Sequence, residues 1–313
     1  MIREKLFNTI RKDKNTPVVV YHLGVDAGFF SEYNNMILCL VYCLENNLKF
    51  SIYSRDANFR LKDGWNDFFI PFCEENKCPL HSLINKRPDE TFRLKFLNTI
   101  DRIMISTVRK LFRNTLLMSD VWIQARSLDI HKQYDIPSIS ASGNLRDICR
   151  KLIELTWVYT PTVQQEVEGL RTSLKLPEKY IGLHIRGGDK FIEASKQEED
   201  VYIKKAMELT DCREAFVLTD DYTVIERLLE KYPEWHFYTL CGQEERGYFH
   251  KQFSKQNRQT RAKQLIRLFT STDIISDGEL FIGTFSSNPG MYLGMKMAPK
   301  KTYSVDVPEW TIW

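Results

Sequence analysis

Two cations and a carboxylate lie on one short glycine-bearing stretch, His184–Lys190 (HIRGGDK). The stretch follows the apolar run Tyr180–Leu183, which predicts a strand. Ligands of open α/β sheets bind beyond the carboxyl ends of the strands. Arg186 can donate two parallel hydrogen bonds to a phosphate, Lys190 adds a point charge, and the glycines allow close backbone approach. The stretch therefore predicts a diphosphate-binding loop; the alternative is a surface turn with a solvated Arg186–Asp189 salt bridge.

A second candidate anion-binding loop follows another apolar segment near the end of the chain. The segment ends at Ile282, and Gly283 permits a tight turn. We expect Asn288 to be the N-cap of a helix, with Pro289 at its first helical position. The free N–H groups and the dipole of that helix end would bind an anion; the alternative is an ordinary capped helix start. The loop residues are Thr284, Phe285, Ser286, Ser287 and Asn288.

Two further loops carry weaker signals. Asp220 and Asp221 follow a predicted strand and could bind a ribose, a base or an acceptor hydroxyl, or Asp221 could cap the helix that begins at Tyr222. In the first half, a loop with Gly24 and Gly28 separates a predicted strand from a helix and could face a cleft. It lacks both the full dinucleotide-binding glycine spacing and a GK[ST] ending, which argues against a Rossmann dehydrogenase and a P-loop NTPase.

Composition narrows the class of protein. The 313 residues carry a net charge of +3 and are 43% hydrophobic, as in a soluble globular protein and unlike a general nucleic-acid binder. The sequence has no Asp-x-Asp pair, and its six histidines and seven cysteines show no zinc-ligand spacing, so we expect no metal. No apolar run approaches the roughly 20 residues of a membrane span, and the chain start lacks the apolar segment of a secretory signal. We therefore expect a cytoplasmic protein with reduced thiols.

The elements that must position these loops alternate between strands and helices. In the first half, strands are expected at 17–23 and 49–53, with a helix from Ser31 to Asn46 capped by Ser31. The pattern over 91–126 favours helix, and so does 145–174, with a break near Thr160-Pro161. In the second half, strands are expected at 180–185, 215–218, 235–238, 280–282 and 302–305, and helices at 222–231, 258–272 and 289–297. This alternation predicts a parallel sheet with helices on both faces.

Taken together, the motifs resemble those of the α1,6-fucosyltransferases and their relatives, which include the N-glycan core and Nod-factor fucosyltransferases. They are HxRxxDK at His184–Lys190, Thr-Asp-Asp at Thr219–Asp221 and GTFSSN at Gly283–Asn288, in the family's order. The segments Gly28–Asn35 and Asp63–Phe69 are similar to first-domain segments of the same family, whereas 79–147 shows no such similarity.

The resemblance implies an α/β, GT-B-like fold, with two Rossmann-like domains facing across a cleft. We place the domain boundary after residue 172. An acceptor-side domain, 1–172, would carry a helical insertion near 91–136, and 173–313 would bind the nucleotide sugar. In the family, the donor is GDP-fucose, the anomeric carbon is inverted and no metal or other cofactor takes part. The candidate nucleotide-binding residues, from the loops and from the resemblance together, are Gly28, His184, Arg186, Asp189, Lys190, Asp220, Asp221, Thr284, Phe285, Ser286, Ser287 and Asn288.

Two departures from the family pattern concern charge and catalysis. Gly187 stands where the family often has a second arginine, and Glu193 is three residues past Lys190, whereas the family's proposed base is four past its lysine. The family acid that precedes the GTFSS loop has Asp273 as its nearest counterpart.

The expected reaction is transfer of fucose from GDP-fucose to a hydroxyl of a glycan, glycolipid or glycopeptide. Arg186 and Lys190, with the helix end, would stabilise the departing diphosphate. Glu193 would take the acceptor proton, with Asp26 or Asp273 as alternatives. Two other functions stay open: transfer from a different nucleotide sugar, and non-catalytic binding of a sugar nucleotide or carbohydrate on the same scaffold. We expect no nucleic-acid partner and no membrane span.

Overall fold

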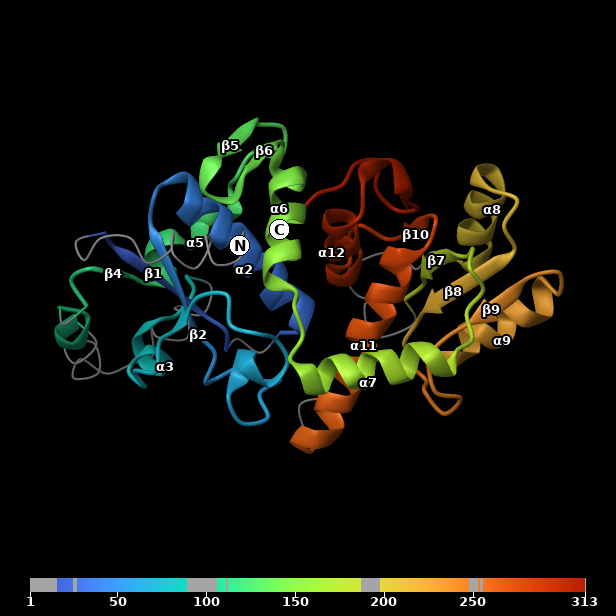
Figure 1. The fold of residues 1–313 in the computed structure, drawn as a ribbon, viewed down its shortest axis with the longest axis horizontal. Helices are drawn as coiled ribbons and strands as arrows, with labels where there is room; N and C mark the ends of the chain where they lie inside the picture. Colours follow the sequence, from blue (N-terminus) through green and yellow to red (C-terminus); the bar gives the residue numbers. More distant parts are fainter. Residues whose placement is uncertain are drawn as a thin grey trace. The chain divides into compact units, whose positions relative to one another are not determined.

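The computed structural model describes residues 16–24, 27–88, 106–110, 112–186, 198–247, 253 and 256–312. The chain divides into two compact units, one ending at Thr160 and the other spanning Pro161–Ile312 (Figure 1). This division falls before the boundary expected after residue 172. The reason is that helix α7 (Pro161–Ser173) packs against helix α11 (Arg258–Asp277) of the second unit, where Arg171 donates a hydrogen bond to Asp277 at 2.5 Å.

The first unit is built on a four-stranded sheet in the order β3-β2-β1-β4, whose strand pairs are parallel. The two strands expected from the sequence are confirmed as β1 and β2. The elements in chain order are β1 (Val18–His22), α2 (Phe29–Glu45), β2 (Lys49–Tyr53), η1 (Gly64–Asp67), β3 (Glu74–Glu75), α3 (His81–Ile84), β4 (Thr115–Leu116), α5 (Met118–Arg126), β5 (Tyr134–Ile136), η3 (Pro137–Ile139), β6 (Ala141–Gly143) and α6 (Leu145–Thr156).

Helix α2 is the centre of the first unit. It packs against the sheet and against α5 and α6, and most of its circumference is buried, as expected of a helix that is apolar nearly all round. The expectation that Ser31 caps this helix is wrong. The N-cap is Gly28, whose carbonyl accepts the N–H groups of Ser31 and Glu32 at 3.0 and 3.2 Å, so the helix begins at Phe29.

A buried ion pair links α2 to the segment after α3. The guanidinium of Arg87 donates to Glu32 Oε1 at 2.6 Å and to the hydroxyl of Tyr21 at 2.9 Å, and it lies 4.2 Å from the ring centroid of Trp122. The second carboxylate oxygen of Glu32 accepts the N–H of Gly24 at 3.2 Å. The pair therefore fixes the start of the Gly24 loop to the core.

The segment expected to be helical over 91–126 is only partly so in its described residues. Residues 106–110 and α5 are helical, but the two-residue strand β4 separates them and pairs with β1. A short antiparallel hairpin, β5–β6, follows and was not expected. The predicted break near Thr160 is confirmed, since α6 ends at Thr156 and α7 begins at Pro161.

The second unit holds a five-stranded sheet in the order β11-β10-β7-β8-β9, whose strand pairs are parallel. All five strands were expected from the sequence. Helix α11 extends beyond the expected end at 272, to Asp277. With α7 and α11, the elements are β7 (Ile181–His184), α8 (Glu199–Leu209), β8 (Glu214–Leu218), α9 (Tyr222–Lys231), β9 (His236–Tyr238), β10 (Phe281–Gly283), α12 (Asn288–Lys296), η5 (Pro299–Lys301) and β11 (Thr302–Ser304).

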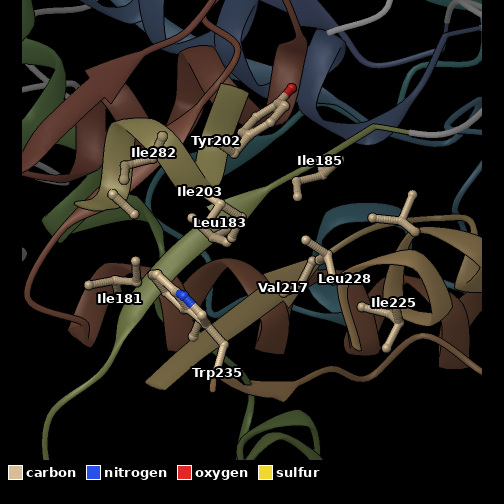
Figure 2. Close-up of a cluster of buried hydrophobic side chains, with 13 residues drawn as sticks. Ile181, Leu183, Ile185, Tyr202, Ile203, Val217, Ile225, Leu228, Trp235 and Ile282 are labelled. Carbon is tan, nitrogen blue, oxygen red and sulfur yellow. The ribbon is translucent and has the colours of Figure 1, made fainter. Parts of the chain in front are cut away.

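The core of the second unit forms on both sides of its central strand. Figure 2 shows Ile181, Leu183 and Ile185 of the β7 segment among buried side chains of α8, α9 and the neighbouring strands. On the other side, α11 approaches β7 so closely that a Cβ at Gly182 would lie 2.6 Å from Ile275. Because β7 is buried on both faces, the strand and the His184 side chain at its end are firmly positioned.

Candidate functional site

The candidate site lies at the point in the second sheet where successive strands stop being added on one side and are added on the other. From β7 the chain adds β8 and β9 on one side, whereas β10 and β11 are added on the other side. Such a switch point leaves a crevice beyond the carboxyl ends of the two central strands, and ligands of open α/β sheets bind there. Because β7 and β10 are paired in parallel, the loops after His184 and after Gly283 begin side by side.

His184, the last residue of β7, is a buried and neutral imidazole. Its exposed fraction is 5%. Burial, with the nearby charge of Arg186, lowers the pKa of His184 to about 3, and the carboxylate of Asp306 partly opposes this shift. A neutral imidazole offers one N–H and one lone pair to a ligand and adds no charge at physiological pH. The imidazole is therefore suited to hydrogen bonding rather than to charge neutralisation.

Ser287 joins this imidazole to the start of α12. Its hydroxyl oxygen lies 3.4 Å from Nδ1 of His184 and accepts the N–H of Gly290 at 3.2 Å. The hydroxyl also donates to the carbonyl of Thr284 at 3.0 Å. The expectation that Asn288 is the N-cap is wrong. Ser287 occupies that position, because its side chain reaches the third residue of the helix while Asn288 already belongs to α12.

The loop before α12 packs closely against the first turn of that helix. A Cβ placed on Gly290 would lie 1.7 Å from the carbonyl oxygen of Thr284, so only a glycine fits without moving the loop. Thr284 also donates its hydroxyl hydrogen to Ser287 Oγ at 3.1 Å. These contacts set the positions of the hydroxyl groups that the sequence placed in the candidate phosphate site.

Two amide groups of this loop already have a partner within the protein. The N–H groups of Phe285 and Ser286 are bonded to the carboxylate of Asp306, at 2.9 and 3.1 Å. The hydroxyl of Ser286 donates to the same carboxylate. Sequence reasoning missed Asp306. The available signal was its place two residues after β11, at the sheet edge where the other candidate loops lie.

On the neighbouring strand, the two aspartates after β8 have different roles in the fold. The carboxylate of Asp221 accepts the N–H and the hydroxyl of Thr223, at 3.0 and 2.7 Å, which makes it the N-cap of α9. The carbonyl of Asp220 accepts the N–H of Gly247 at 2.8 Å. The capping alternative is therefore confirmed for Asp221, and nucleotide contact by either aspartate remains a prediction.

The remaining predicted residues belong to other elements or lie outside the described part of the chain. Gly28 belongs to the first unit, where it caps α2 and where a Cβ would meet nothing within 4 Å. Asp273 pairs with Lys296 between α11 and α12. Four further residues lie outside the described residues: Asp26, Asp189, Lys190 and Glu193. Arg186 is described and partly buried, directly after Ile185.

Three general properties of the described residues bear on the sequence expectations. They contain no group of three or more His, Cys, Asp or Glu that could hold a metal ion. All seven cysteines are free thiols. In the described chain, every helix is too short or too polar to cross a membrane.

Comparison with known proteins identifies the fold. No family model matches the sequence, and no curated protein matches it. A NodZ α-1,6-fucosyltransferase structure soaked with GDP-fucose is 13% identical, with 90% of this chain and 93% of that chain covered and a TM-score of 0.55. A structure of the fucosyltransferase NodZ from Bradyrhizobium is 12% identical, with 89% of this chain and 92% of that chain covered and a TM-score of 0.52.

Fucosyltransferases from other sources have a similar structure. An Arabidopsis thaliana FUT1 variant in complex with GDP is 11% identical, covers 98% of this chain and 75% of its own, and has a TM-score of 0.52. POFUT1 without ligand is 9% identical, with 93% and 98% covered and a TM-score of 0.51. The chain thus has the mixed α/β fold, with parallel sheets and flanking helices, of the GT-B fucosyltransferases.

Proposed function

We propose that this chain is an inverting glycosyltransferase that moves fucose from GDP-fucose to a hydroxyl of a glycan acceptor, without a metal ion. One observation carries the proposal. The end of β7 and the loop before α12 meet at the switch point of the second sheet, where the hydroxyl oxygen of Ser287 lies 3.4 Å from Nδ1 of His184. The fold comparison supports it, because similar structures were obtained with GDP or with GDP-fucose.

In the proposed reaction, the second unit binds the donor. Negative charge develops on the diphosphate as its bond to the anomeric carbon breaks. Arg186, and Lys190 from the adjoining segment, neutralise that charge, and the N-terminus of α12 adds its dipole. The neutral His184 bonds to a polar group of the nucleoside. Asp220 and Asp221 border the nucleotide on the neighbouring strand.

The acceptor side belongs to the first unit in this proposal. The acceptor hydroxyl attacks the anomeric carbon from the face opposite the diphosphate, which inverts the configuration. Glu193 takes the hydroxyl proton as the new bond forms. The products are the fucosylated acceptor and GDP, and the proton on Glu193 returns to water.

Donor hydrolysis by water offers a test that needs no acceptor. We expect the purified chain to release GDP from GDP-fucose, and GDP to raise its melting temperature more than UDP does. Arg186→Ala should lower turnover by roughly 100-fold or more, because a cation facing the leaving group is lost. Arg171→Ala is the matched control, since Arg171 pairs with Asp277 on the surface of the same unit.

Each outcome of this test distinguishes the candidate functions. Selective stabilisation by UDP would replace GDP-fucose with another nucleotide sugar. Stabilisation by GDP with neither hydrolysis nor transfer would favour a non-catalytic binding protein. Near-normal turnover in Arg186→Ala would remove the assigned role of Arg186.

A further inference from the structure

The carboxylate of Asp306 holds the loop before α12 through three donors from that loop. The N–H groups of Phe285 and Ser286 donate to Oδ1 and Oδ2 at 2.9 and 3.1 Å, and the hydroxyl of Ser286 donates to Oδ2. A fourth donor, the hydroxyl of Ser304, reaches Oδ1 at 2.6 Å from the end of β11. Hydrogen bonds to an ionised acceptor are among the strongest in proteins.

The charge of this carboxylate is maintained by the same donors. Burial raises the pKa of Asp306, but the hydrogen bonds from Ser286, Ser304 and Phe285 outweigh burial and bring the pKa below its ordinary value. Asp306 is therefore ionised at neutral pH. The loop that the sequence assigned to phosphate binding already has an internal anion on two of its amides.

We propose that Asp306 is a positioning residue of the donor site: it fixes the Thr284–Ser287 loop in the shape in which Ser287 and the first turn of α12 contact the donor diphosphate. This inference rests on the proposed function. The first residue of the loop is fixed by the close packing of the Thr284 carbonyl on Gly290. Held at its first residue and at its middle, the loop needs little reordering when the diphosphate binds, which favours affinity.

A second role for the same contacts would weaken donor binding instead of favouring it. In that role, the carboxylate of Asp306 would occupy two amides in place of a phosphate, and the donor would have to displace it. The turn that carries Asp306 argues against displacement. Ser304 Oγ accepts the N–H groups of Asp306 and Val307, at 3.3 and 3.2 Å, while it donates to the carboxylate. The carboxylate is thus built into its own turn, and removing it from the loop would break that turn as well.

The two roles predict opposite effects of Asp306→Asn on GDP binding. The amide keeps the size of the side chain but turns an NH₂ group toward N–H donors, so the loop loses its anchor. We expect the dissociation constant of the full-length chain for GDP to rise about tenfold or more, the effect of losing one charged hydrogen-bond anchor. The dissociation constant for guanosine, which has no phosphate, should change less than about twofold on the same argument.

Two further variants isolate the cause. Ser304→Ala keeps the charge of Asp306 but removes its turn partner, so we expect a smaller loss of GDP affinity and no change for guanosine. It also provides the test if Asp306→Asn does not fold. Asp200→Asn is the charge-matched control, because Asp200 pairs with Lys231 between α8 and α9 of the same unit.

Ligand-observed NMR can measure both ligands even when guanosine binds weakly. Weaker GDP binding with unchanged guanosine binding supports the proposal. Unchanged or tighter GDP binding by Asp306→Asn overturns it, and so does equal weakening of both ligands, which indicates general loss of structure. If the unaltered chain binds neither ligand, the proposed function itself fails, and the role of Asp306 fails with it.

Discussion

The hydroxyl oxygen of Ser287 lies 3.4 Å from Nδ1 of His184, across 103 residues of sequence. One partner ends β7 and the other caps α12, so this contact joins the end of β7 to the start of α12 at the switch point. A nucleotide diphosphate bound here would have Arg186 just beyond the end of β7 and the N-terminus of α12 beyond the end of β10.

The protonation of His184 is the first prediction. Its pKa of about 3 results from burial and the charge of Arg186, opposed by Asp306. An NMR titration of the full chain should therefore show a neutral His184 from pH 8 to about pH 5. Arg186→Gln should raise the pKa of His184, though not to its ordinary value, whereas Asp306→Asn should lower it further.

The lowered pKa of His184 also determines how this residue changes the stability of the fold with pH. The unfolded chain takes up the His184 proton near pH 6.5 and the folded chain does so near pH 3, so this residue reduces stability as the pH falls through that interval. A His184 signal that titrates near pH 6.5 would contradict the burial and the neighbouring charge described for it.

Two glycine substitutions in the second unit should have opposite effects on its free energy of unfolding. Gly290→Ala places a Cβ 1.7 Å from the Thr284 carbonyl oxygen and should destabilise the unit by about 1–3 kcal/mol, the usual cost of overpacking. Gly169 lies on the exposed face of α7 with nothing within 4 Å, and Gly169→Ala should stabilise by about 0.5–1 kcal/mol through helix propensity.

Denaturant unfolding of both glycine variants, monitored on the same transition, checks this pair. Equal stabilities for Gly290→Ala and the unaltered chain would mean that the loop moves freely away from α12. In that case the loop would not be pre-shaped for a ligand.

Asp306 should contribute stability that disappears in acid. Its pKa is below the ordinary 3.8 because its hydrogen bonds outweigh burial, so the contribution is complete above that ordinary value. It is lost as the pH falls through the lower pKa of the folded state. Asp306→Asn should be about 1–3 kcal/mol less stable at pH 6 and should lose less on acidification than the unaltered chain. Parallel stability curves for the two proteins between pH 5 and pH 2 would refute this role.

The buried pair in the first unit gives a prediction that is independent of the site. Glu32→Gln leaves the charge of Arg87, whose side chain is 6% exposed, without its carboxylate and should cost about 3–5 kcal/mol. Glu208→Gln breaks the exposed pair with Lys205 and should cost less than about 1 kcal/mol. Urea unfolding of both variants measures the difference. A loss for Glu32→Gln as small as that for Glu208→Gln would contradict the burial of the pair.

The sequence predicted those elements that depend on residues adjacent in the chain. The apolar runs that became β1, β2 and β7 predict strands directly, and the glycine and hydroxyl residues after Ile282 predict a loop before a helix. The cap of that helix was assigned one residue too late, because Ser287 and Asn288 are both good capping residues and only the backbone path selects between them.

What the sequence could not predict depends on neighbours distant in the chain. Strand β4 exists because Thr115 and Leu116 pair with β1, within a stretch whose composition favours helix. The role of Asp306 depends on β11 lying beside β10, and nothing near Asp306 in the sequence specifies that neighbour. The switch point itself follows from the strand order, which no local pattern contains.

A crystal structure of the full chain with GDP would show whether the second unit binds the donor at its switch point. We expect the diphosphate beyond the carboxyl ends of β7 and β10, with a phosphate oxygen within hydrogen-bonding distance of the Arg186 guanidinium and near the first turn of α12. A diphosphate bound away from Arg186, or GDP bound only to the first unit, would contradict this expectation.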